Sequence, residues 1–113
     1  MNRDEGLISI DQVGSVELRA GRILVAEPHP EADRLLRLQV DLGAEQRQII
    51  AGIAEAYEPA ELVGRTIVVV ANLKPARLRG QISEGMLLAA TGEDGRPHLL
   101  TLDGDLAPGA RVS

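Results

Sequence analysis

Residues 36–42, Leu-Arg-Leu-Gln-Val-Asp-Leu, alternate strictly between apolar and polar side chains. Successive side chains of a β-strand point to opposite faces, so a strand here would separate the two kinds of residue. A helix does not separate residues in this way, because its period is 3.6 residues. The pattern therefore predicts a strand and a β-containing fold, with one strand face against a core formed by Leu36, Leu38, Val40 and Leu42.

Four other segments predict further strands. Alternation on both sides of Gly21 predicts a long first strand over residues 16–27, bent at the glycine as in small curved barrels. Residues 47–53 would return as a third strand after a short connection. The apolar runs 66–72 and 86–91 are typical of buried strands.

Two short helices are predicted from their terminal residues. Ser9 and Gln12 have the spacing of a capping box, which favours a short helix near the N-terminus. Pro59 and Gly64 stand at the first turn and just past the end of a second helix, at residues 58–64.

Turn-forming residues predict a loop at 28–33 and a turn at 92–95, and we expect the short segments 98–102 and 110–113 to pair with each other. The central order, three strands, a helix and two strands, is that of the OB-fold, a mainly β, five-stranded Greek-key barrel that commonly binds oligonucleotides. With 113 residues, the chain is expected to form a single domain, residues 1–113. Both terminal extensions would add to the barrel.

The composition excludes several classes of protein. The chain has no cysteine, no segment of signal-peptide type and no apolar run of transmembrane length, so we expect a cytoplasmic protein without a membrane partner. His29 and Asp33 are better explained as a loop histidine beside a turn aspartate than as metal ligands. Ser83 lies in Gly-Gln-Ile-Ser-Glu-Gly, which is not a nucleophile elbow. We expect no enzyme activity, no catalytic residue, no metal and no cofactor.

One segment of this acidic chain is purely basic. The formal charge is −5, yet residues 62–83 contain no carboxylate and carry Lys74, the only lysine, with Arg65, Arg77 and Arg79. Three of these cations lie on a connector between strands, where extended arginines two apart would point the same way, with Leu78 turned inward. The connector is either a phosphate-binding ledge or a solvated loop whose arginines pair with nearby acids.

The near absence of aromatic residues limits how such a ledge could bind RNA. The chain has no Phe and no Trp, and Tyr57 is its single aromatic residue. Readers of single-stranded sequence stack bases on aromatic rings, so binding here would depend on backbone and shape. A core without Phe or Trp also buries little area per residue, which favours dimerisation through the terminal extensions.

The sequence resembles the bacterial tRNA-binding OB domain, which occurs at the C-terminus of methionyl-tRNA synthetases and in free-standing dimeric tRNA-binding proteins. The resemblance covers residues 8–113, and its motifs are HPEADRL, IIAGIA, NLKPARLRG and SEGMLLAA. It implies a homodimer that recognises the shape of the tRNA elbow without selecting among tRNA species. A methionyl-tRNA synthetase is a candidate partner, and the chain would be free-standing, a separately encoded synthetase partner or an excised C-terminal domain.

The resemblance also implies a set of RNA-binding residues. Ser83 would hydrogen-bond a phosphate or a ribose hydroxyl, Glu84 would orient an arginine or lysine, and Met86 would be either an apolar contact or part of the core. Arg34 and Arg47 are weaker additions. The full expected set is Asn72, Lys74, Arg77, Arg79, Ser83, Glu84, Met86, Arg34 and Arg47.

Two other functions remain open from the sequence. A related branch of the fold, the CsaA proteins, implies a peptide-binding export chaperone as the alternative to a tRNA-binding module. A dimerisation element for a synthetase is compatible with tRNA binding. The motifs HPEAD and NLKPARLRG favour the tRNA branch.

Overall fold

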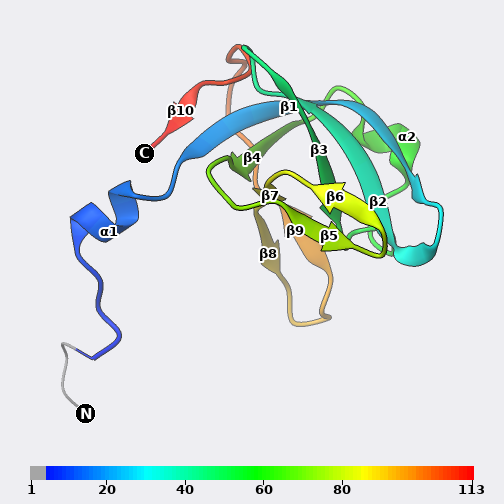
Figure 1. Ribbon diagram of the computed structural model, residues 1–113, viewed down its shortest axis with the longest axis horizontal. Coiled ribbons are helices and arrows are strands. Elements are labelled where there is room, and N and C mark those ends of the chain that lie inside the picture. The colour runs from blue at the N-terminus through cyan, green and yellow to red at the C-terminus, as the bar shows by residue number, and fades with distance from the viewer. Residues whose placement is uncertain (1–4) are drawn as a thin grey trace.

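A curved antiparallel sheet forms the body of the computed structural model, which describes residues 5–113 (Figure 1). The main path through the six-stranded sheet is β3-β2-β1-β4-β7, and β10 pairs with β1 outside this path. The bounds of these strands are β1 Leu18–His29, β2 Ala32–Asp41, β3 Gln46–Ala51, β4 Thr66–Val70, β7 Met86–Leu87 and β10 Arg111–Val112.

Two small hairpins and two short helices complete the chain. The bounds are β5 Ala76–Leu78 with β6 Gln81–Ser83, β8 Ala89–Thr91 with β9 Pro97–Leu99, α1 Ile10–Gly14 and α2 Pro59–Leu62. This mainly β architecture agrees with the predicted fold class. Within residues 5–113, neither helix has the length and apolarity needed to cross a membrane.

The alternating strand is confirmed. Leu36, Leu38, Val40 and Leu42 are all buried, and β2 lies between β1 and β3. The buried core cluster to which they belong is aliphatic, and the partly buried Tyr57 packs against it. Its members on the other elements include Ile23, Ile49, Leu62, Ile67 and Val69.

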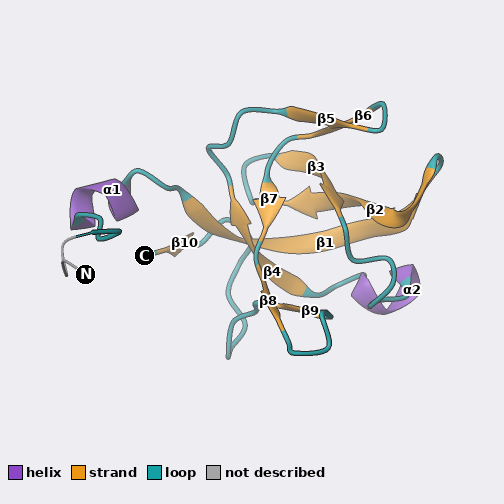
Figure 2. Cartoon of the chain, turned by 90° about the horizontal axis from the view of Figure 1, so that it is seen from below, coloured by secondary structure: helices purple, strands orange, loops and turns teal. Residues whose placement is uncertain are grey.

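The sheet curls until β3 approaches the segment that follows β6 (Figure 2). The Glu84 N–H donates to the Gln48 carbonyl at 2.8 Å, and the Gln48 side-chain amide donates to the Ile82 carbonyl at 2.8 Å. These bonds attach the β5–β6 hairpin to an edge strand of the sheet.

Both predicted helix signals are confirmed. The Ser9 hydroxyl accepts from the Gln12 N–H at 3.1 Å, and the Gln12 side chain accepts from the Ser9 N–H at 2.8 Å. Pro59 begins α2, and Gly64 adopts a φ of +90° just past its end. The α1 helix stands away from the sheet (Figure 1). The α2 helix, in contrast, buries Leu62 in the core.

Three predicted boundaries were wrong. The loop expected at 28–33 is only the two-residue turn between β1 and β2, because β1 continues through Pro28 and β2 already begins at Ala32. The strand expected at 86–91 is divided into β7 and β8, which pair with different partners. The terminal segments do not pair with each other: β9 pairs with β8, and β10 pairs with β1.

Candidate nucleic-acid interface

The basic segment folds into a hairpin that we call the basic hairpin, residues 76–83. Its strands β5 and β6 pair with Leu78 opposite Gln81, so Arg79 and Gly80 form a two-residue turn. Both turn residues have positive φ, +52° for Arg79 and +87° for Gly80, as a type I′ turn requires. Arg77 and Arg79 were expected to point the same way. This was wrong, because Arg79 leaves the extended conformation at the turn. Leu78 is 38% exposed and does not turn inward.

The cations of the basic hairpin and its connector are uncompensated. Within residues 5–113, Lys74, Arg77 and Arg79 are exposed and form neither an ion pair nor a side-chain hydrogen bond. Arg65, the fourth cation of the segment, lies elsewhere, with its guanidinium 5.4 Å from the centre of the Tyr57 ring. Three exposed positive charges thus follow one another along the basic hairpin and its connector in an acidic protein, where phosphates can reach them.

Arg34 extends this positive surface. It lines a shallow hollow with Asp33 and Arg79, on the side where the β1–β2 turn meets the hairpin tip. Its ion pair with Glu55 spans 3.3 Å between side chains that are 84% and 75% exposed, so the pair is weak and easily exchanged for a phosphate.

Apolar side chains flank the cations. Leu73, Ile82 and Met86 are 45%, 44% and 47% exposed, and all lie on or beside the basic hairpin. Met86 was expected to be either an apolar contact at the surface or part of the core. A half-exposed side chain is not part of the core, so Met86 belongs to the surface. The surface combines charge with aliphatic contact area, without an aromatic ring.

Ser83 fixes the base of the hairpin. Ser83 is buried, and its hydroxyl accepts a hydrogen bond from the Ile50 N–H at 3.0 Å while donating one to the Gly85 carbonyl at 2.9 Å. The expectation that this hydroxyl is open to a phosphate does not fit that geometry. Ser83 instead ties β6 to β3, which holds the hairpin in place.

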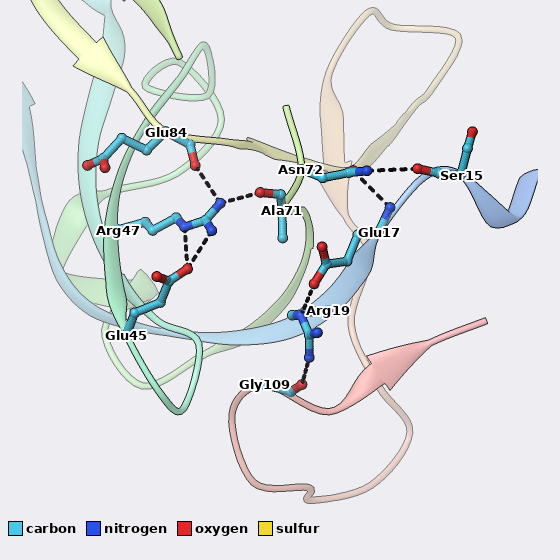
Figure 3. Close-up of polar contacts among 9 residues, drawn as sticks. All are labelled: Ser15, Glu17, Arg19, Glu45, Arg47, Ala71, Asn72, Glu84 and Gly109. Carbon is cyan, nitrogen blue, oxygen red and sulfur yellow. Dashed lines mark hydrogen bonds and ion pairs between the residues drawn. The ribbon is translucent and has the colours of Figure 1, made fainter. Parts of the chain in front are cut away.

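Arg47 and Glu84 form a second fastening point, drawn in Figure 3. The Arg47 guanidinium pairs with Glu45 and donates to the carbonyls of Ala71 and Glu84, the latter at 3.3 Å. Glu84 does contact an arginine, but through its backbone oxygen; its carboxylate accepts from the Gln48 N–H at 3.3 Å. Arg47 is 24% exposed at its side chain, so it holds the end of β4 beside β3.

Asn72 anchors the start of the connector, also in Figure 3. Its side-chain oxygen accepts from the Glu17 N–H at 2.9 Å, and its amide nitrogen donates to the Ser15 carbonyl at 2.7 Å. Both bonds reach the segment between α1 and β1. Of the nine expected residues, Asn72, Ser83, Glu84 and Arg47 therefore use polar groups in hydrogen bonds within the chain, although Asn72 and Glu84 are also exposed. The other five have exposed side chains, and within residues 5–113 only Arg34 among them forms an ion pair.

His29, expected as a loop histidine beside a turn aspartate, instead lies at the end of β1 against the basic hairpin. His29 is buried, and one ring nitrogen lies 3.1 Å from the Leu78 carbonyl oxygen. A signal was present in the sequence, because a histidine between two prolines at a strand end is held rigidly. Its partner, 49 residues further on, could not be deduced from spacing.

The comparisons with known proteins agree on a family. Residues 18–111 match a family model described as a putative tRNA binding domain. The methionine--tRNA ligase of Thermotoga maritima is 55% identical over 113 residues, which are 100% of this chain and 18% of that protein. The ligase of Bacillus subtilis is 50% identical over 105 residues, 93% of this chain and 16% of that protein. The chain thus spans less than a fifth of the length of these curated relatives.

Solved structures with the same fold carry two different descriptions. A MetRS related protein from Pyrococcus horikoshii matches with a TM-score of 0.89 and 36% identity, covering 95% of this chain and 98% of that one. The chaperone CsaA of Bacillus anthracis matches with a TM-score of 0.87 and 31% identity, covering 96% of this chain and 100% of that one. Because the two TM-scores are so similar, they do not distinguish between the two descriptions. The chemistry of the surface is needed to distinguish them.

Proposed function

Because the chain belongs to the family of putative tRNA-binding domains, we propose that it is a non-catalytic module that binds tRNA through the basic hairpin. The observation that supports this most is the set of three uncompensated cations at Lys74, Arg77 and Arg79, in a chain of net charge −5. Excess carboxylates elsewhere would repel RNA, so binding would be confined to this surface.

The proposed contacts divide into two groups. Lys74, Arg77, Arg79 and Arg34 would meet phosphates, and Met86 would pack its side chain against sugar or base edges. The other four residues would position this surface from within the chain: Asn72, Ser83, Glu84 and Arg47. Recognition would follow the shape of the RNA backbone, because no aromatic platform for unstacked bases lies on this face in residues 5–113.

Titration of labelled bulk tRNA at several salt concentrations tests this function. Each phosphate contact contributes a log–log slope of about −0.7 to −0.9, so about three to five contacts would give a slope near −3. Different tRNA species should bind with similar affinity. A flat salt response, or a single tRNA bound about a hundredfold more tightly than the rest, would contradict backbone and shape recognition.

A peptide-binding chaperone of the CsaA type is the second candidate function. The exposed Leu73, Leu78, Ile82 and Met86 favour it, since aliphatic surface can hold an unfolded segment. Competition separates the two functions: an unfolded peptide that displaced tRNA at low concentration, with little dependence on salt, would favour the chaperone.

We also propose that the chain is a homodimer. The apolar side of α1 is uncovered, with Ile10 86% and Val13 55% exposed, and a groove beside it is lined by residues of α1 and β10. A second copy would bury these side chains through its own α1 and C-terminal strand, as two-fold symmetry allows.

Sedimentation is expected to give about twice the chain mass of 12.1 kDa at micromolar concentration. Val13→Asp should shift the protein toward monomer, because a carboxylate would have to be buried at the contact. Val63→Asp is the matched control, since Val63 is 53% exposed but lies next to α2. A wild-type monomer, or equal effects of both variants, would contradict the proposed contact.

A methionyl-tRNA synthetase is the partner that we propose for the assembled module, because most of each relative lies outside the matched segment. A cytoplasmic location follows from a role with tRNA. Co-purification of the chain with the synthetase of its own cell would test both statements.

A further inference from the structure

His29 joins two parts of the molecule that are far apart in sequence. It lies at the end of β1, beside the two-residue turn to β2, and is only 5% exposed. Its Nδ1 accepts a hydrogen bond from the Glu31 N–H at 2.9 Å. The proton of the neutral ring is therefore on Nε2, which donates to the Leu78 carbonyl at 3.1 Å. Leu78 directly precedes Arg79 at the hairpin turn.

A second contact holds the other strand of the hairpin at the same level. Arg37, which forms an ion pair with Glu27, donates from Nη1 to the Gln81 side-chain oxygen at 3.2 Å. Leu78 and Gln81 are the pair that closes the Arg79-Gly80 turn. Both strands are thus tied to the β1–β2 ribbon just before the tip, which lies beside the β1–β2 turn in both views (Figures 1 and 2).

An untethered hairpin of this length would not keep a fixed orientation. Each of its strands has three residues, and an isolated two-stranded hairpin is at best marginally stable in water. The base is held by Ser83, but the tip depends on the contacts from His29 and Arg37. A tip fixed before RNA arrives loses less conformational entropy on binding.

We infer that His29 is a positioning residue for the RNA-binding hairpin, and that the donor at Nε2 and the acceptor at Nδ1 together hold the tip beside the β1–β2 turn. This inference rests on the proposed function. A side chain without the ring's donor would leave the Leu78 carbonyl without this partner and would release the tip.

The charges around this site do not by themselves decide the outcome. The two elements that His29 joins carry groups of both signs: Glu27, Glu31, Asp33, Arg34 and Arg37 on the β1–β2 ribbon, and Arg77 and Arg79 on the hairpin. The hydrogen bond to the Leu78 carbonyl is the specific contact that His29 supplies.

The experiment measures the tRNA affinity of the full chain and of variants at His29, at pH 7.5 and one salt concentration. Release of the tip predicts a loss of affinity of about five- to tenfold.

Three variants separate positioning from plain stability. His29→Gln keeps a donor and an acceptor, so it should bind tRNA nearly as well as the wild type. His29→Leu fills the site without hydrogen bonds and should show the full loss. His98→Gln is the control: His98 is exposed and is the only other histidine, so this variant should behave like the wild type. If His29→Leu bound tRNA like the wild type at pH 7.5, the inference would be wrong.

Amide hydrogen exchange gives a readout that does not depend on RNA. Protection of the β5–β6 amides, relative to those of β4, should fall in His29→Leu and stay near the wild-type level in His29→Gln. Unchanged protection would overturn the positioning role even if the chain did not bind tRNA. Loss of protection together with an absence of tRNA binding would instead support the positioning contact and refute the proposed function.

Discussion

Replacing Arg79 with Glu is expected to weaken tRNA binding by far more than tenfold while leaving the fold intact. Arg79 is exposed at the hairpin tip without an ion pair in residues 5–113, so no internal contact is lost. A charged hydrogen bond to a phosphate contributes about 1.5–3 kcal/mol, and the reversal adds repulsion to that loss. Binding isotherms at two salt concentrations should show the difference from wild type shrinking as salt rises.

Two further variants show whether position or net charge is responsible. Arg96→Glu makes the same charge change in the turn between β8 and β9, where its guanidinium has only a long contact of 3.5 Å to the Ala56 carbonyl. Arg79→Asn removes the charge and gives the turn an Asn-Gly pair, which type I′ turns favour. We expect Arg96→Glu to bind nearly normally and Arg79→Asn to lose about tenfold. Equal losses for the two reversals would mean that only net charge matters, and unfolding of Arg79→Glu would mark Arg79 as structural.

Gly109→Ala is expected to destabilise the fold by about 3 kcal/mol or more. Gly109 has a φ of +97°, and an added Cβ would overlap the carbonyl oxygen of Leu42 in the β2–β3 connection. The backbone cannot shift freely there, because the Gly109 N–H donates to the Ala20 carbonyl at 2.7 Å. Denaturant unfolding measures the free energy, and the midpoint should fall with little change in slope.

Alanine variants of two other glycines separate the cost of the backbone conformation from the cost of the steric overlap. Gly95 has a φ of +79° with open space at its Cβ position, so Gly95→Ala measures the backbone conformation alone. Gly104 also faces open space but without a positive φ, so Gly104→Ala should be nearly neutral. The expected order of destabilisation is Gly109, then Gly95, then Gly104. If Gly109→Ala cost no more than Gly95→Ala, the close approach to Leu42 would not constrain the fold.

Local features of the fold were predictable because neighbouring residues determine them. The strand at residues 36–42 follows from alternation, and the start of α1 follows from the reciprocal hydrogen bonds of Ser9 and Gln12. The terminal strand pairing was not predictable in this way. Arg111 pairs with Arg19 in β1, 92 positions earlier, and the pattern of a two-residue strand gives no information on its partner.

The same distinction applies to the candidate site. The clustering of Lys74, Arg77 and Arg79 was visible in the sequence, since it depends on composition and proximity along the chain. The internal roles of Ser83 and Asn72 were not, because each depends on a partner more than 30 residues away. The direction of Arg79 was missed for a different reason: its positive φ is rare for a residue other than glycine.

Tyr57 gives the protein a single natural optical probe. Its ring packs against the core and lies under the Arg65 guanidinium, and its hydroxyl accepts from the Leu99 N–H at 3.1 Å. Loss of β9 from its place would therefore change tyrosine emission. Because no other aromatic ring exists in the chain, a tryptophan introduced at Leu78 could be excited selectively and would report on the hairpin alone. Unfolding of the body and movement of the basic hairpin could then be followed as separate signals in one sample.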